Sequence, residues 1–162
     1  MKPLSIATDI AWQIAVREAS ASGSQFIEKE HVVIGILSLT KITAGAPDDM
    51  KLDRKQLNAI RAEWAALSEV FSSVSFNTTS YRRELRKNLG KGSYNHHTDK
   101  VIHRSPECKA FFKIAAALSR DSNELSVLYL LAAIVGEPGA ALGSLLTADN
   151  IKSSELKKLL IE

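Results

Sequence analysis

The chain has 162 residues, 45% hydrophobic and 24% charged, which is typical of a globular domain with its own core. Its single cysteine, Cys108, excludes an internal disulfide, and the N-terminus lacks the apolar run of a secretion signal, so we expect a cytoplasmic protein. No apolar run approaches the roughly 20 residues of a membrane helix, and the net charge of +3 comes from residues 51–104, whose own net charge is +6.

The first predicted element is a helix that begins after Ser5. Serine is a preferred N-cap residue because its hydroxyl accepts a hydrogen bond from a free backbone N–H in the first turn. Alanine then recurs every fourth residue, at Ala7, Ala11, Ala15 and Ala19. This spacing indicates a helix with a narrow small-residue stripe, against which a second helix packs closely. A polar turn over residues 20–25 ends it.

The next segment, residues 28–37, reads EKEHVVIGIL. Its β-branched residues favour a strand, but a short apolar run can equally be a buried helix. His31 opens the run, and a histidine there is a candidate general base or metal ligand. The other interpretation is a core histidine, hydrogen-bonded to backbone or side chain at a junction between elements. We favour that structural role.

Residues 53–71 predict an amphipathic helix. Apolar side chains follow one another at steps of three and four residues, which gives one core-facing stripe. The stripe consists of Leu57, Ile60, Trp64, Leu67 and Phe71. The sequence SFNTTS at 75–80 is expected to end this helix.

A short basic helix over residues 80–89 follows, and Gly90 is expected to end it. Residues 91–104 are expected to form an exposed loop. The cations of this region are Arg82, Arg83, Arg86, Lys87 and Lys91. Such a segment can bind nucleic acid or an acidic partner, although a solvated helix face is the commoner role.

From residue 105 the chain repeats its own beginning. Residues 105–120 align with 5–20 without a gap, so that Ser105 matches Ser5 and Phe112 matches Trp12. After a polar turn comes LYLLAAIV at 128–135, which matches the apolar run of the first copy and is rich in the strong helix formers leucine and alanine. Because two copies of one repeat share a fold, we predict that 28–37 is also a buried helix.

The remaining sequence predicts a turn at Pro138-Gly139, a short helix, a break near Asp149-Asn150, and a last helix capped by Ser153 or Ser154. No segment shows the alternation of a half-buried strand. We therefore predict an all-α fold, a compact helical bundle of two pseudo-symmetric repeats. The organisation is a single domain over residues 1–162. Repeat one spans about 3–45, linking helices and a basic loop about 46–104, and repeat two about 105–162.

This pattern resembles the N-terminal domain of Clp/Hsp100 ATPases, nearest to the ClpA and ClpC types, with an enlarged middle segment. The residues that carry the resemblance are Ala15, Glu18, Ala19, Gly23, Ile27, Glu30, His31, Gly35 and Leu37. The resemblance implies a non-catalytic docking domain. Such a domain binds adaptor proteins or unfolded, protease-bound clients for a Clp-type ATPase module, which lies in the same chain or in another.

The resemblance also implies a binding edge. Glu30 matches a glutamate of the acidic edge with which ClpA-type domains contact the adaptor ClpS, Glu28 neighbours it, and Gln25 replaces a second acidic position. ClpC-type domains recognise phosphoarginine with a glutamate from each repeat, and Val127 is expected at the second of these positions. Lys29 stands where the family often has a helix-capping threonine, so we expect a weakened N-cap.

Other chemistry has little support in the sequence. His96, His97, His103 and Cys108 do not have the spacing of a zinc site. The NLGKGS run at 88–93 lacks the first glycine and the Ser/Thr of a phosphate-binding loop. We therefore expect no enzyme, no metal, no cofactor and no membrane partner. The alternative function is a helical nucleic-acid-associated protein that uses residues 82–104. Against it, Tyr81 and Tyr94 are the only aromatic residues near this basic segment on which bases could stack.

Overall fold

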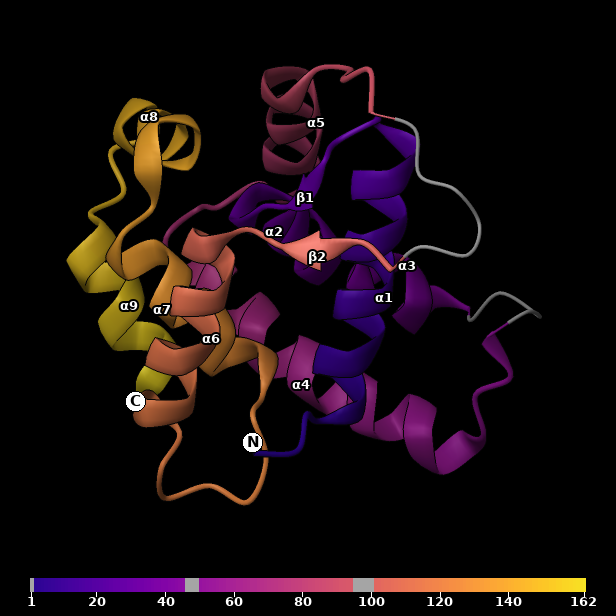
Figure 1. Cartoon of the computed structure of the whole chain (residues 1–162). Helices are drawn as coiled ribbons and strands as arrows, with labels where there is room; N and C mark the ends of the chain where they lie inside the picture. Colours follow the sequence, from indigo (N-terminus) through magenta and orange to yellow (C-terminus); the bar gives the residue numbers. More distant parts are fainter. Residues whose placement is uncertain (1, 46–49, 95–100) are drawn as a thin grey trace.

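The computed structural model describes residues 2–45, 50–94 and 101–162. Its helices are α1 (Ile6–Ala21), α2 (Lys29–Leu37), α3 (Leu39–Ala44), α4 (Arg54–Ser73), α5 (Thr78–Leu89), α6 (Pro106–Leu118), α7 (Val127–Gly136), α8 (Gly139–Ala148) and α9 (Ser153–Ile161). Two strands of two residues each, β1 (Phe26–Ile27) and β2 (His103–Arg104), pair in parallel. The predicted all-α fold class is confirmed, and so is the helix over the ambiguous run 28–37 (Figure 1).

Ser5 and Ser105 show that the two copies fold alike. Both serines have φ −63° and ψ 160°, and each hydroxyl accepts the backbone N–H three residues further on. The N–H of Ser5 donates to the carbonyl of Leu125 at 3.1 Å, and that of Ser105 donates to the carbonyl of Ile27, also at 3.1 Å. The segment before each copy's first helix therefore pairs with the segment before the other copy's second helix, as a pseudo-twofold relation requires.

The alanine stripe of α1 lies against α2, as the spacing predicts. Ala7, Ala11, Ala15 and Ala19 are fully buried. The two helices approach so closely that a Cβ on Gly35 would collide with the backbone of Ala11. Backbone contact of this kind needs small residues on both helices, because any larger side chain would hold the axes apart.

The middle segment adds α4 and α5. Asp53 caps α4 in a capping box with Gln56, and Ile60, Leu67 and Phe71 of the predicted core face are fully buried, with Leu57 and Trp64 partly buried. The rings of Phe71 and Phe76 stack at 4.3 Å, and those of Phe76 and Tyr81 at 3.8 Å. This aromatic stack joins the end of α4 to the start of α5.

The bounds of α5 and α9 differ from prediction at their N-termini. Asn77 caps α5, so the SFNTTS segment ends one helix and already begins the next. Gly90, at φ +63°, ends α5 as predicted. The prediction that Ser153 or Ser154 caps α9 is wrong, because Lys152 holds the N-cap position and Ser153 is the first helical residue.

Residues 91–94 form an exposed loop, as predicted for 91–104, but backbone hydrogen bonds tie this loop to the first repeat. Gly92 donates its N–H to the carbonyl of Ser22 at 2.7 Å, and Tyr94 donates to that of Gly23 at 3.0 Å. Gly23 and Gly92 lie so close that a Cβ on either would collide with the carbonyl of the other. Further on, β2 pairs with β1. Backbone pairing with the α1–β1 turn and with β1 therefore positions both described parts of this segment.

The helices α4 and α5 pack against both repeats. α5 packs against α2 and α8, whereas α4 packs against α1 and α3 and also against α7 and α9. In the described residues no single helix is long and apolar enough to span a membrane, and α7 and α8 meet that length only as a pair bent by 91°.

Candidate functional site

The first turn of α2 is built around Glu28 and His31. Glu28 is the N-cap and forms a capping box with His31, whose Nδ1 accepts the Glu28 N–H at 2.9 Å. The expectation that Lys29 holds the cap position is wrong, because Glu28 holds it, one residue earlier. The helix start, and with it the position of every side chain in its first turn, is therefore well defined.

His31 itself is 1% exposed, and its Nε2 lies 3.3 Å from the Ser24 hydroxyl. Since Nδ1 accepts, the ring proton is on Nε2. Burial lowers the pKa of His31 to about 4, which the charge of Glu18 only partly opposes. The ring is thus neutral at pH 7 with both nitrogens hydrogen-bonded, which agrees with the interpretation as a core histidine.

Lys29 connects the two repeats. Its side chain is 6% exposed and its ammonium lies 2.5 Å from a carboxylate oxygen of Glu107, at the start of α6. The same ammonium lies 5.3 Å from the ring centroid of Phe111 and touches the backbone at Gly139, where a Cβ would collide with it. The positive charge of Lys29 is therefore neutralised within the repeat junction.

Beside this junction runs a groove made of two adjoining hollows. The larger, about 620 Å³, is lined by Gly23, Ser24, Gln25, Phe26, Glu28, Leu89, Gly92, Ser93 and Tyr94. The smaller, about 290 Å³, is lined by Glu28, Glu30, Asn88, Leu89, Glu107 and Ala141. Glu28 and Leu89 belong to both linings, so the two hollows adjoin, and we call them together the Glu28 groove.

The Glu28 groove brings together the three residues that the sequence singled out for partner binding. Gln25 and Glu28 line its larger hollow, and Glu28 and Glu30 its smaller one. Sequence reasoning missed Phe26, Tyr94 and Glu107. Phe26 directly follows Gln25 in the chain, whereas Tyr94 and Glu107 are distant and reach the groove only through the pairing of residues 92–94 with the α1–β1 turn and the docking of α6.

Carboxylates dominate the smaller hollow. Burial raises the pKa of Glu30, and the charges of Glu28 and Glu107 raise it further, while its own backbone and Lys29 act in the opposite direction. Lys29 pairs with Glu107, so the carboxylates of Glu28 and Glu30 leave this end of the groove negative. A cation placed there would relieve their mutual repulsion.

The pseudo-equivalent junction at the start of α7 is different. Since Ile27 corresponds to Leu125, the register sets Val127 opposite Lys29 and Leu128 opposite Glu30. The expectation that Val127 stands at the position of Glu30 is thus wrong by one residue, although the position is apolar either way. No carboxylate of α7 corresponds to Glu30.

A carboxylate from α4 occupies that second junction instead. The Val127 N–H donates to Oε1 of Glu63 at 3.0 Å, and the Ser5 side chain is also hydrogen-bonded to Glu63. Burial raises the pKa of Glu63, and these two hydrogen bonds oppose the rise. Helix α4 therefore closes one junction with its own side chain, whereas α5 leaves the Glu28 groove open at the other.

The predicted basic patch is only partly on the surface. Arg82 is 7% exposed and donates to the carbonyl of Leu37 at 3.4 Å, so it does not belong to an exposed patch. Arg86 pairs with Glu18 through two hydrogen bonds, from Nε at 3.2 Å and from Nη2 at 2.5 Å. Arg83, Lys87 and Lys91 are exposed.

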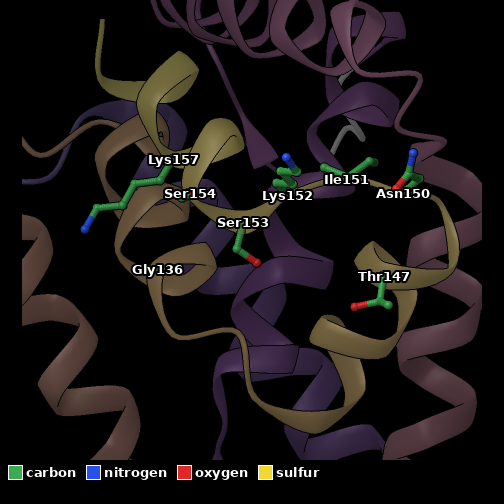
Figure 2. A pocket seen from close by; sticks show the side chains of 8 residues that line it. All are labelled: Gly136, Thr147, Asn150, Ile151, Lys152, Ser153, Ser154 and Lys157. Atoms are coloured by element: carbon green, nitrogen blue, oxygen red, sulfur yellow. The ribbon is translucent and has the colours of Figure 1, made fainter.

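A further hollow of about 660 Å³ lies at the start of α9 (Figure 2). It is lined by Gly136, Thr147, Asn150, Ile151, Lys152, Ser153, Ser154 and Lys157. The hydroxyls of Ser153 and Thr147 face its interior, while the side chain of Lys157 extends away from it. Polar groups of this kind bind water as readily as any solute, so the lining alone indicates no particular chemistry.

The candidate metal ligands do not form a cluster in the part of the chain that is described. Within these ranges no three His, Cys, Asp or Glu side chains are placed to hold an ion. His103 is exposed in β2, Cys108 is buried, and burial raises the pKa of its thiol to about 12. His96 and His97 lie outside the described residues.

Comparisons with known proteins bear on the fold. No protein-family model and no curated protein sequence matches the chain. Among solved structures, it is similar to the crystal structure of the Hsp104 N-terminal domain from Candida albicans, with 9% sequence identity and a TM-score of 0.69. The match covers 99% of this chain and 91% of that one. At this identity the likeness establishes the fold alone: the chain has the fold of an Hsp100 N-terminal domain.

Proposed function

We propose that this protein is a non-catalytic docking domain that binds adaptor or client proteins for a Clp-type ATPase module in the cytoplasm, without metal or cofactor. The observation that carries the proposal is the Glu28 groove. There Gln25, Glu28 and Glu30, which the family resemblance marks as a binding edge, line two adjoining open hollows beside the junction of the repeats. An open, charged groove on a helical scaffold suits the recognition of another polypeptide.

The state of His31 supports a binding role over a catalytic one. A general base has to reach a proton of its substrate, and its pKa has to lie near the working pH. His31 is buried, both of its ring nitrogens are hydrogen-bonded, and its pKa is lowered to about 4. The fold likeness to an Hsp100 N-terminal domain is a second, independent support.

Docking of this kind is expected to be weak for one copy of the domain. The groove is shallow and its two hollows are open to solvent, so the area buried by a bound segment is small. If the domain is presented several times by an oligomeric ATPase, effective concentration raises the overall affinity without any new contact.

The proposal is tested by affinity capture from native cytoplasm with the full chain as bait. Wild type is compared with Glu30→Lys, which reverses a charge in the groove, and with Glu155→Lys, the same reversal at an exposed position of α9. Proteins retained by wild type and Glu155→Lys but lost with Glu30→Lys establish docking at the groove. If all three baits capture the same proteins in the same amounts, this site is not the docking site.

Nucleic-acid binding is the second candidate, and the exposed cations Arg83, Lys87 and Lys91 favour it. Binding of this kind depends on counterion release, so affinity falls steeply with rising salt. A nuclease-treated arm of the capture separates the candidates. Partners that disappear with nuclease assign the function to α5, and partners that resist nuclease exclude nucleic acid as the bridge.

A further inference from the structure

Two exposed aromatic side chains line the larger hollow of the Glu28 groove. Large apolar side chains are exposed at five places in the described residues, namely Phe26, Tyr94, Val101, Leu159 and Ile161. Phe26 is 38% exposed and Tyr94 43% exposed, and both line the same hollow. Grouped exposed aromatics are typical of binding surfaces, because a partner that covers them removes apolar surface from water.

Backbone pairing fixes the position of both aromatic residues. Phe26 belongs to β1, which pairs with β2. Tyr94 is held by its N–H, which donates to the carbonyl of Gly23, and by the close approach of Gly92 to Gly23. A preformed aromatic wall loses little conformational entropy when a ligand binds to it.

The other end of the same groove is negative. Glu28 and Glu30 line it, and the ammonium of Lys29, whose charge acts on Glu30, is already paired with Glu107. A guanidinium or ammonium group in this hollow would form charge-assisted hydrogen bonds with the two carboxylates. An acidic group would meet like charges at close range.

Resting on the docking function proposed above, we infer that the Glu28 groove binds an extended segment of a partner protein in which an apolar or aromatic residue stands beside an arginine or lysine. The apolar side chain lies against Phe26 and Tyr94. The cationic side chain reaches Glu28 and Glu30, and Glu28 lines both hollows and so joins the two halves of the recognition. The cationic residue supplies most of the discrimination, because opposite charge rejects acidic segments whatever their apolar content.

The experiment is an amide-resolved NMR titration of the full chain with three capped peptides of glycine and serine that differ only in a central pair, Phe-Arg, Phe-Glu or Ser-Arg. We expect the Phe-Arg peptide to shift the amide signals of Phe26, Glu28, Glu30 and Tyr94. The other two peptides are expected to bind with an affinity at least about tenfold lower. Equal binding of Phe-Arg and Phe-Glu peptides, or shifts confined to other helices, would overturn the inference.

Matched variants keep the result interpretable if a substitution affects folding. Phe26→Ser removes half of the aromatic wall, and Leu159→Ser removes a side chain of similar exposure, 39%, from α9. Phe-Arg binding is expected to fall several-fold with Phe26→Ser and to stay unchanged with Leu159→Ser, each variant checked by its own amide spectrum.

The titration and the capture experiment together separate this inference from the docking function. If capture depends on Glu30 but no peptide shifts the amide signals of the groove residues, the ligand class is wrong and the docking function stands. If capture is independent of Glu30 and no peptide binds, both are wrong.

Discussion

Trp12 and Phe112 occupy equivalent positions in the two repeats, and their rings meet edge to face, with centroids 5.4 Å apart and planes at 88°. The pseudo-twofold relation thus brings a residue of each copy into contact with its own counterpart. Arg104 lies over the Phe112 ring, 5.0 Å from its centroid. The contact is therefore part of the interface that holds the two repeats together.

A double-mutant cycle at this pair should show coupling. Phe112→Ala is expected to cost about 3 kcal/mol of unfolding free energy, since Phe112 is 7% exposed. Part of this loss, about 1 kcal/mol, belongs to the edge-to-face contact and should be absent when Trp12→Ala is already present. Urea denaturation of wild type, both single variants and the double variant measures this coupling energy. Strictly additive losses would mean that the rings do not interact.

Gly35→Ala is expected to destabilise the protein by about 3 kcal/mol, although alanine is the better helix former. Its Cβ would collide with the carbonyl of Ala11, and α1 and α2 would have to separate along their whole contact. Gly143→Ala in α8 is the control, because the nearest atom to its Cβ, Cγ of Pro138, lies 3.7 Å away. It should raise stability by up to about 1 kcal/mol, the helix-propensity gain. Thermal melts compare the two.

Lys29 and Glu107 should respond unequally to substitution. Glu107→Ala leaves the nearly buried ammonium of Lys29 without its carboxylate and is expected to cost about 2 kcal/mol. Lys29→Met removes the buried charge and leaves Glu107, whose side chain is 57% exposed, to solvent, so the loss should stay within about 1 kcal/mol. Lys29→Met should also rescue Glu107→Ala. Equal losses for both single variants would contradict this account of the pair.

Stability should fall with acid because His31 is buried and neutral. The folded pKa is about 4 and the ordinary value is 6.5, so between these pH values the unfolded chain binds a proton that the folded chain does not. The free energy of unfolding is therefore highest above pH 6.5, the ordinary pKa, and falls as the pH decreases toward about 4, the pKa of His31 in the folded protein. We expect a loss of about 2 kcal/mol between pH 7 and pH 5 from this residue.

His31→Gln is the comparison, because glutamine at this position also reaches back to the N-cap but does not titrate. Urea denaturation at pH 7, 6 and 5 should show a much smaller acid loss for this variant. An identical loss in both proteins would assign the pH dependence to other groups.

Glu63 should matter as a hydrogen-bond acceptor and not as a charge. Glu63→Ala leaves the Val127 N–H at the start of α7 without its acceptor and is expected to cost about 1 to 2 kcal/mol. Glu63→Gln keeps an acceptor and should be near neutral, because burial already raises the pKa of this carboxyl and so works against the charged form. Hydrogen exchange of the Val127 amide should quicken in the alanine variant alone.

Much of the secondary structure follows from local signals in the sequence. Ser5 and Ser105 cap helices by hydrogen bonds to residues three positions away, and Gly90 ends α5 through its own positive φ. The core stripe of α4 depends only on helical spacing. The internal repeat allowed one further prediction. The β-branched residues at 28–37 are compatible with strand or helix, and the leucine-rich second copy indicated a helix.

The tertiary structure decided what lies beside what. Arg82 appears in the sequence as one more exposed cation, and its burial depends on where α5 docks against the end of α2. The register of Val127 and the capping of α7 by Glu63 likewise follow from pairing across the repeats.

The Glu28 groove shows the same division. The sequence by itself determined that Gln25, Glu28 and Glu30 lie near the start of one helix. The tertiary structure places Glu107 beside them through its ion pair with Lys29, and Tyr94 through the hydrogen bond of its N–H to the carbonyl of Gly23. These partners are distant along the chain, Lys29 and Glu107 being separated by 78 positions. The free energy that brings them together comes from burying the two repeats against each other. Local propensity determines helices, but only that shared burial determines which helix ends meet.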